Sequence, residues 1–212
     1  MPNLYKFNIG NDFVIKAAKA IEDFISESEK NPVRIALSGG SSPKAVYEKL
    51  AESEKIDWSK VEIFIVDERI DDSNRKMIEG ALTSKLPNLK KFHPLTDKTE
   101  KELEKINRPF FDLVLLGLGE DGHTASIFPR SEAITELEKL ILHTQSPAGV
   151  KERITLSFPA ILSTQKIIFL IRGANKKEIL EKMLNEETSE MEIPAKIALE
   201  HQDTDVYFDY SY

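Results

Sequence analysis

The residues of this sequence that are best suited to chemistry follow one apolar segment in the middle of the chain. Residues 111–116 include a single polar residue, which is typical of a strand buried on both faces of a parallel sheet. Asp121 and His123 come shortly after it, in a stretch rich in glycine. An imidazole exchanges protons near neutral pH, and open α/β sheets bind ligands at the carboxyl ends of their strands. The segment therefore predicts a site for acid–base chemistry.

The glycines of this stretch, Gly117, Gly119 and Gly122, have the spacing of a dinucleotide-binding fingerprint, but their context does not fit it. That fingerprint requires a long helix directly after the third glycine. Here Pro129 would end any helix soon after it begins. The fingerprint also usually belongs to the first strand–helix unit of a domain, whereas this strand lies in mid-chain. We therefore expect no nicotinamide or flavin cofactor.

A second glycine-rich segment, residues 38–43, is a candidate anion site. It reads Ser-Gly-Gly-Ser-Ser-Pro and lies between a short predicted strand and a predicted helix. We expect Ser42 to be the N-cap of that helix and Pro43 to be its first residue. Backbone N–H groups and hydroxyls at a helix N-terminus bind anions. The segment is not a Walker P-loop, because no Gly-Lys-Ser/Thr follows, and an ordinary glycine turn with a capped helix is the alternative.

Charged residues follow two further predicted strands. Asp67, Glu68 and Arg69 come after a strand over residues 61–66, where they either take part in function or are ordinary solvated charges. Lys176 lies in the first turn of a helix that follows a strand. The helix dipole disfavours a lysine at that position, which favours a ligand-binding role.

Helical and strand periodicities alternate along the chain. Helices are expected over 11–29, from 43, over 73–85, at 159–162, from the segment 172–176 to about 185 and from 193. Strands are expected over 33–37, 61–66, 111–116, 140–144, from 153, over 166–171 and, at a sheet edge, over 206–210. Residues 96–107 are expected to form a solvated helical face, and His93-Pro94 a loop. Strand–helix units in series predict an α/β fold with an open, mainly parallel, Rossmann-like sheet and helices on both faces. No repeat or linker marks a boundary, so residues 1–212 are expected to form a single domain.

The composition excludes several classes of protein. The chain has 212 residues, a formal net charge of −7 and a pI near 5.3, which argues against nucleic acid as a partner. It has no cysteine, so disulfides, thiolate nucleophiles and Cys-ligated zinc are excluded. No apolar run approaches the roughly 20 residues of a membrane span, and no signal-peptide core is found, so a cytoplasmic location is expected. An anionic substrate would need a local cluster of Lys and Arg that works against the overall charge.

Six segments, in the same order along the chain, resemble the 6-phosphogluconolactonases of the sugar-phosphate isomerase and deaminase superfamily. They are residues 37–43, Asp67-Glu68-Arg69, Ser73-Asn74, residues 116–129, residues 153–156 and residues 173–176. The most specific part reads Asp-Gly-His-Thr-Ala-Ser-Ile-Phe-Pro over residues 121–129. One departure is that only residues 70–72 separate the second and third segments. Family members usually carry a longer loop there, which could help to cover the substrate.

The resemblance implies hydrolysis of 6-phosphoglucono-1,5-lactone in the oxidative pentose phosphate pathway, with no metal, cofactor or obligatory protein partner. It implies that His123 is the general base for water, oriented by Asp121 or Asp67. Arg69, or the N–H groups of Gly39 and Gly40, would hold the developing oxyanion. The residues implied to bind the substrate are Ser38, Gly39, Gly40, Ser41, Asn74, Arg153 and Lys176. Of these, Ser41, Arg153 and Lys176 are candidates for the phosphate, with Arg69 as a fourth.

Two other functions remain as alternatives. Glucosamine-6-phosphate deaminases resemble this chain at the glycine loop, at Asp67 and at His123, but they carry a Phe-Asn-Glu-Pro signature whose Glu takes part in the chemistry. Here residues 126–129 read Ser-Ile-Phe-Pro, without an acid. The second alternative is a non-catalytic sugar-phosphate sensor. A sensor needs no base, so the retention of His123 together with Arg69 and Lys176 argues against it.

Overall fold

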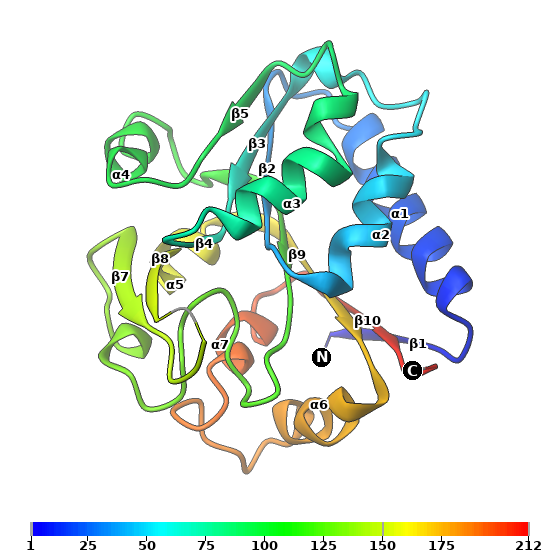
Figure 1. Cartoon of the computed structure of the whole chain (residues 1–212). Coiled ribbons are helices and arrows are strands. Elements are labelled where there is room, and N and C mark those ends of the chain that lie inside the picture. Colours follow the sequence, from blue (N-terminus) through cyan, green and yellow to red (C-terminus); the bar gives the residue numbers. More distant parts are fainter. Residues whose placement is uncertain (1, 150, 212) are drawn as a thin grey trace.

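The computed structural model describes residues 2–149 and 151–211, and its centre is a seven-stranded sheet (Figure 1). The spatial order is β1 (Asn3–Phe7), β10 (Thr204–Asp209), β9 (Thr164–Arg172), β6 (Phe111–Leu116), β2 (Val33–Leu37), β3 (Val61–Ile65) and β5 (Lys91–His93). Each neighbouring pair in this sheet is parallel. The predicted α/β fold with an open, mainly parallel sheet is therefore confirmed.

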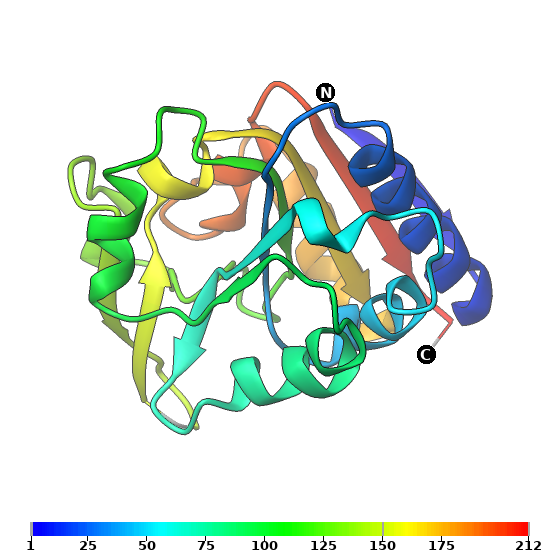
Figure 2. The ribbon, with the colours of Figure 1, turned by 90° about the horizontal axis from the view of Figure 1, so that it is seen from above.

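Helices cover both faces of this sheet, as the two views show (Figures 1 and 2). One face carries α1 (Gly10–Ser26), α2 (Ser41–Leu50) and α3 (Ser73–Ala81), and the other carries α4 (Lys98–Leu103), α5 (Phe158–Ile161), α6 (Lys177–Leu184) and α7 (Ala195–Leu199). Short 3₁₀ helices are η1 (Trp58–Lys60), η2 (Thr83–Lys85), η3 (Glu132–Ile134) and η4 (Ala174–Lys176). Among the described residues, no helix is long and apolar enough to cross a membrane.

The chain reverses its direction along the sheet between β2 and β6. Connections after β2 and β3 lead toward β5, whereas connections after β6 and β9 lead toward β10. Right-handed connections that run in opposite directions place their helices on opposite faces. The segments that follow β2 and β6 therefore separate, although the two strands are direct neighbours. A crevice at such a switch point is where open α/β sheets bind ligands.

The centre of the sheet is buried on both faces, as the apolar strands predicted. All six residues of β6 are buried, and this includes its single polar residue, Asp112. The carboxylate of Asp112 accepts hydrogen bonds from Nζ of Lys30 at 2.5 Å and from the backbone N–H of Arg34 at 2.8 Å. These charged and polar partners offset the cost of burying a carboxylate in the middle of the sheet.

The outer strands differ from the prediction in three respects. The strand at 206–210 was expected at an edge, but β10 is an inner strand because β1 pairs along its outer side. The short strand β1 was not predicted, since most of its residues are exposed. His93 was expected in a loop, but it belongs to β5, where its ring stacks on Phe64 with ring centres 3.9 Å apart.

A second, three-stranded antiparallel sheet also went unpredicted. Its order is β4 (Asp67–Arg69), β8 (Glu152–Leu156) and β7 (Ile141–Gln145). The charged residues after β3 therefore leave the main sheet and pair with β8. Helix α4 packs on the protein through the buried Thr99 and Leu103, so it is not only the solvated face that its charged sequence suggested.

Candidate active site

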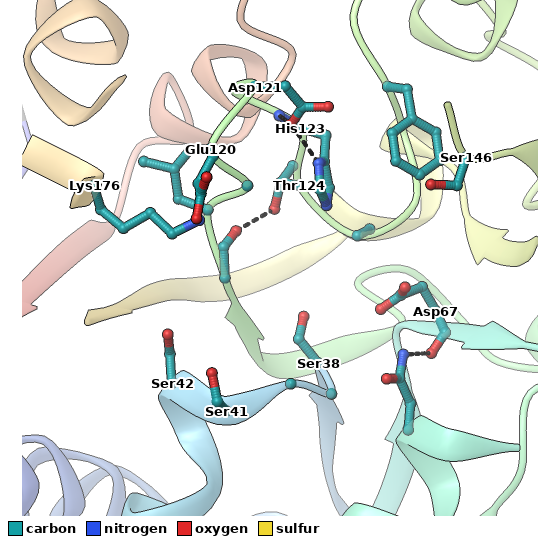
Figure 3. Close-up of a pocket in the computed structure, with 18 of the residues that line it drawn as sticks. Ser38, Ser41, Ser42, Asp67, Glu120, Asp121, His123, Thr124, Ser146 and Lys176 are labelled. Carbon is teal, nitrogen blue, oxygen red and sulfur yellow. Dashed lines mark hydrogen bonds and ion pairs between the residues drawn. The ribbon is translucent and has the colours of Figure 1, made fainter. Parts of the chain in front are cut away.

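A cavity of about 780 Å³ lies at the switch point of the main sheet (Figure 3). Its walls come from the segments after β2, β3, β6 and β9 and from the β7–β8 hairpin. The predicted site residues that line it are Ser38, Gly39, Gly40, Ser41, Asp67, Arg69, Asn74, Asp121, His123 and Lys176. Arg153 is not among the residues that line this cavity. The structure thus brings together residues that lie far apart in the sequence.

The turn after β6 joins His123 to Asp121. Nδ1 of His123 lies 2.5 Å from Oδ1 of Asp121, and the same oxygen accepts the backbone N–H of His123 at 3.1 Å. Burial alone would raise the pKa of Asp121, but the hydrogen bonds and charge of His123 outweigh it, so that the pKa is lowered. An ionised Asp121 therefore holds the ring through Nδ1 and leaves Nε2 for proton transfer.

Two glycines make this turn possible. A Cβ atom at Gly119 would lie 2.1 Å from Nδ1 of His123 and 2.6 Å from Oδ1 of Asp121. Gly122 has a φ of +88°, and a Cβ atom there would lie 2.7 Å from Cδ1 of Ile193. Any side chain at either position would displace the pair or its support. The glycine pattern thus serves to position an imidazole.

Asp67 lies across the cavity from His123 and is buried (Figure 3). Its Oδ2 accepts a hydrogen bond from Oγ of Ser126 at 2.7 Å. Burial raises the pKa of the Asp67 carboxyl, although Ser126 and the nearby positive charges act in the opposite direction. The sequence left two acids as partners for the imidazole. In the structure, Asp121 makes that hydrogen bond and Asp67 contacts Ser126 instead.

Asn74 supports the glycine loop that follows β2. Its Nδ2 donates to the carbonyl of Asp67 at 2.7 Å, and a Cβ atom on Gly39 would lie 2.1 Å from its Cγ. Its backbone N–H donates to Oε1 of Glu68 at 2.9 Å, and the N–H of Arg75 donates to the other oxygen of Glu68 at 2.7 Å. Asn74 lines the cavity, but its amide is held against the protein. Glu68, to which the sequence assigned no role, caps the start of α3.

The glycine loop ends at the N-terminus of α2. Gly40, with a φ of +97°, is the N-cap, and the helix begins at Ser41. The prediction of Ser42 as the N-cap is therefore wrong, and the hydroxyls of both serines are left beside the cavity. Oγ of Ser38 and the N–H groups of Gly39 and Gly40 have no hydrogen-bond partner among the described residues. The loop thus offers a group of donors to a ligand.

Lys176, from η4, extends on the same side of the cavity as Ser41 and Ser42 (Figure 3). Burial lowers the pKa of its ammonium group, while the charges of Glu120 and Asp121 act in the opposite direction. Its Nζ lies 3.9 Å from Oε1 of Glu120, whose side chain is 70% exposed. The contact is long and on the solvent side, so it contributes little, and the same Glu120 oxygen accepts a shorter hydrogen bond from Nδ2 of Asn175 at 2.7 Å.

Arg172 is a cavity residue that the sequence analysis missed. It is the last residue of β9 and is in register with Asp209 of β10. Its Nε donates to Oδ2 of the fully buried Asp209 at 2.9 Å, and its guanidinium carbon lies 5.6 Å from the ring centre of Phe13. The sequence signal that could have identified Arg172 was its position directly after the predicted strand over residues 166–171. Residues 146–148 of the β7–β8 hairpin also line the cavity and carried no comparable signal.

Arg69 and Arg153 are register partners in β4 and β8. Burial and the positive charge of Arg69 lower the pKa of Arg153, and nearby carboxylates act in the opposite direction. Arg69 lines the cavity, and its Nη1 lies 3.4 Å from Oγ of Ser73. Arg69 is therefore the cation of this pair that reaches the cavity.

Comparison with known proteins agrees with this arrangement. The model of the family described as glucosamine-6-phosphate isomerases/6-phosphogluconolactonase matches residues 10–208. The chain belongs to this family. A member from Schizosaccharomyces pombe, named a probable 6-phosphogluconolactonase, is 37% identical in an alignment 210 residues long that covers 82% of this chain and 82% of that protein. The family resemblance predicted from the motifs is thereby confirmed.

Solved structures of family members have the same fold. A crystal structure of a 6-phosphogluconolactonase from Shewanella baltica superimposes with a TM-score of 0.88 at 27% identity, over 100% of this chain and 98% of the other. The 6-phosphogluconolactonase of Thermotoga maritima gives a TM-score of 0.80 at 30% identity, over 99% of this chain and 100% of the other. In each comparison, the structural similarity thus extends over nearly the whole length of the two chains.

Proposed function

We propose that this chain hydrolyses 6-phospho-D-glucono-1,5-lactone to 6-phosphogluconate, a step of the oxidative pentose phosphate pathway, and that His123 is its general base. The relatives named 6-phosphogluconolactonase support the reaction. The observation that carries the proposal is the pair of His123 and Asp121 beside a cavity that also offers unpaired donors. A lactone is an activated ester, so a base, an oxyanion site and a proton donor suffice.

The base and the proton donor are the same imidazole. Nε2 of His123 takes a proton from water while the water oxygen bonds to C1 of the lactone. The bond between C1 and the ring oxygen then breaks, and the imidazolium returns its proton to that oxygen. Asp121, hydrogen-bonded to Nδ1, stabilises the positive charge that the ring carries between these two events. Phe128, whose ring centre lies 4.8 Å from that of His123, limits the movement of the ring.

The oxyanion that forms at C1 needs donors that are already in place. The N–H groups of Gly39 and Gly40 meet this requirement, because they have no partner among the described residues and line the cavity. Oγ of Ser38, which is buried and likewise lacks a partner there, adds a third donor. Arg69 is the cationic alternative from the β4 side.

The phosphate of the substrate carries about two negative charges at neutral pH. We place it at the N-terminus of α2, where the backbone dipole and the hydroxyl of Ser41 favour an anion. Lys176 extends from the same side, and Arg172 adds a second positive charge to the cavity wall. Arg153 lies outside that wall, so we do not place it on the phosphate.

The cavity-lining residues that come after His123 in the sequence argue against the alternative of a sugar-phosphate deaminase. Among them are Thr124, Ala125 and Phe128, where the deaminase signature would supply a glutamate. The decisive experiment offers fresh 6-phosphogluconolactone and glucosamine 6-phosphate side by side to the purified protein. We expect acid release from the lactone above its spontaneous rate. Ammonia release, or binding of either compound without turnover, would contradict the proposal.

We further propose that residues 1–212 act as one domain, in the cytoplasm, on a small sugar-phosphate lactone. Neither nucleic acid nor an obligatory protein partner is needed, which is consistent with a net charge of −7. The buried apolar side chains from both faces of the sheet form one continuous cluster, which supports a single domain. Full turnover by the purified chain alone is the expected result.

A further inference from the structure

Lys196 is a buried cation with an unusual set of partners. It is the second residue of α7, and it is 8% exposed. Its Nζ donates to the backbone carbonyls of Asn185, Glu186 and Thr188 at 2.6, 3.0 and 2.8 Å. An ammonium group has three protons, so each can serve one carbonyl. A buried charge must be matched by polar groups, and the lysine therefore holds the start of the α6–α7 segment in one conformation.

The α6–α7 segment, residues 185–194, lies against the segment that follows β6 (Figure 1). The N–H of Ala195, directly after it, donates to the carbonyl of Gly122 at 3.1 Å. Ile193 occupies the space where a Cβ atom of Gly122 would be. Eight residues further along the β6 loop, the N–H of Arg130 donates to the carbonyl of Met191 at 2.8 Å. The α6–α7 segment and the start of α7 thus contact the loop after β6 at two points, Gly122 and Arg130. Gly122 belongs to the turn that carries Asp121 and His123, which we call the catalytic turn.

We propose that Lys196 is a positioning residue for the reaction. It orders the α6–α7 segment, that segment fixes Gly122, and Gly122 precedes the base His123. Lys196 does not line the active-site cavity, so it acts without touching the substrate. The inference rests on the proposed role of His123. Its consequence for rate is large, because a displacement of about 1 Å in a catalytic group can cost on the order of 10²-fold.

Lys196→Met is the first test, because it keeps most of the side-chain length and removes the three donors. Lys166→Met is the matched control. Lys166 is also largely buried, at 16% side-chain exposure, and it forms ion pairs with Asp203 and Asp205 at 2.7 and 2.9 Å. It lies near the amino end of β9, away from the cavity at the carboxyl end. Both variants lose a buried ammonium group, and only Lys196→Met should disturb the catalytic turn.

We expect Lys196→Met to lower kcat for the lactone by about 10- to 100-fold while KM stays within about twofold. Lys166→Met should be less stable to heat and keep its kcat. Lys196→Arg, which retains N–H donors, should recover part of the lost kcat. Equal kcat in the Lys196→Met and Lys166→Met enzymes, both folded, would overturn the proposal.

A second measurement tests the conformation of the catalytic turn and does not depend on enzyme activity. The ring signals of His123 in NMR spectra at fixed pH should shift or broaden in Lys196→Met and stay unchanged in Lys166→Met. His93 and His143, which lie outside the cavity lining, serve as internal references. If the wild-type protein fails to open the lactone, the proposed function is wrong, and this NMR comparison still tests the positioning role. An unchanged His123 signal in folded Lys196→Met would refute that role.

Ile193→Ala keeps the test decisive if Lys196→Met does not fold. It leaves Lys196 and its three carbonyl partners in place and removes the side chain that packs against Gly122. We expect the same pattern, with a lower kcat, a nearly constant KM and an altered His123 signal. A folded Ile193→Ala enzyme with wild-type kcat and an unchanged His123 signal would overturn the chain of contacts on which the proposal depends.

Discussion

The hydrogen bond between Asp121 and His123 gives the sharpest prediction of the mechanism. Asp121→Asn preserves the size of the side chain and its ability to accept a hydrogen bond, but it removes the negative charge. In the proposed mechanism the imidazole becomes positively charged during turnover, and this charge loses its partner in the variant. The loss should therefore appear in kcat, because the interaction is stronger in the transition state than in the resting enzyme.

The size of the loss follows from the geometry. Hydrogen bonds to charged groups contribute about 1.5–3 kcal/mol. The side chains of His123 and Asp121 are 32% and 40% exposed, so solvent screens their interaction. We therefore expect the lower part of the range, about 1.5–2 kcal/mol, which corresponds to a decrease of kcat of about 10- to 30-fold.

The assay is acid release from freshly prepared lactone, corrected for spontaneous opening, with folding verified by circular dichroism. Asp97→Asn is the matched control, because Asp97 pairs with Nε2 of His143 at 2.6 Å on the protein surface. It should leave kcat unchanged. Asp67→Asn tests the other acid that the sequence had offered as a partner. A folded Asp121→Asn enzyme with kcat within about twofold of wild type, or a larger loss in Asp67→Asn, would refute Asp121 as the partner of the base.

The remaining predictions concern three residues of the cavity. His123→Ala should lower kcat by about 10²–10⁴ with the fold intact, and near-normal turnover would remove His123 from the role of base. Lys176→Ala should cost about 1.5–3 kcal/mol in kcat/KM on the phosphorylated lactone and almost nothing on gluconolactone without phosphate, and equal losses on the two would show that Lys176 does not bind the phosphate. Burial raises the pKa of Asp67 in the folded chain, so its contribution to stability is complete below the unfolded pKa and is lost as the pH rises through the folded pKa. In urea unfolding, Asp67→Asn should therefore gain stability relative to wild type as the pH rises above about 4, the usual pKa of an aspartate in an unfolded chain, and a difference that does not vary with pH would contradict this.

The sequence predicted the parts of the fold whose signal is local. Strands β2 and β6 and residues 167–171 of β9 are mostly apolar and buried, and their pattern indicated a parallel sheet. Strand β1 has no such signal, because most of its residues are exposed. It is stabilised by its pairing with β10 and not by apolar residues of its own. Without β1, residues 206–210 could only be placed at an edge. Strand pairing between distant segments is a tertiary property that periodicity does not report.

In the candidate site, too, contacts within a local turn could be predicted from the sequence, and contacts between distant segments could not. Asp121 and His123 are two residues apart, so their contact depends only on a local turn that the glycines indicated. Arg172 needs Asp209, which lies far along the chain and meets it only through the register of β9 and β10. Asp67 was a candidate partner of the imidazole because both follow strands. Its actual partner, Ser126, could be known only once β4 had been seen to leave the main sheet.

An acidic protein that binds an anion must keep its cations charged and in place against the overall negative charge. Lys176 shows how this chain does so. Burial lowers the pKa of its ammonium group, and the carboxylate of Glu120 acts in the opposite direction. Glu120 lies 3.9 Å away on the exposed side, and the same oxygen accepts a hydrogen bond from Nδ2 of Asn175 at 2.7 Å. Arg172 instead contacts the fully buried Asp209, so the carboxylate beside one cation of the cavity is exposed and the carboxylate beside the other is buried.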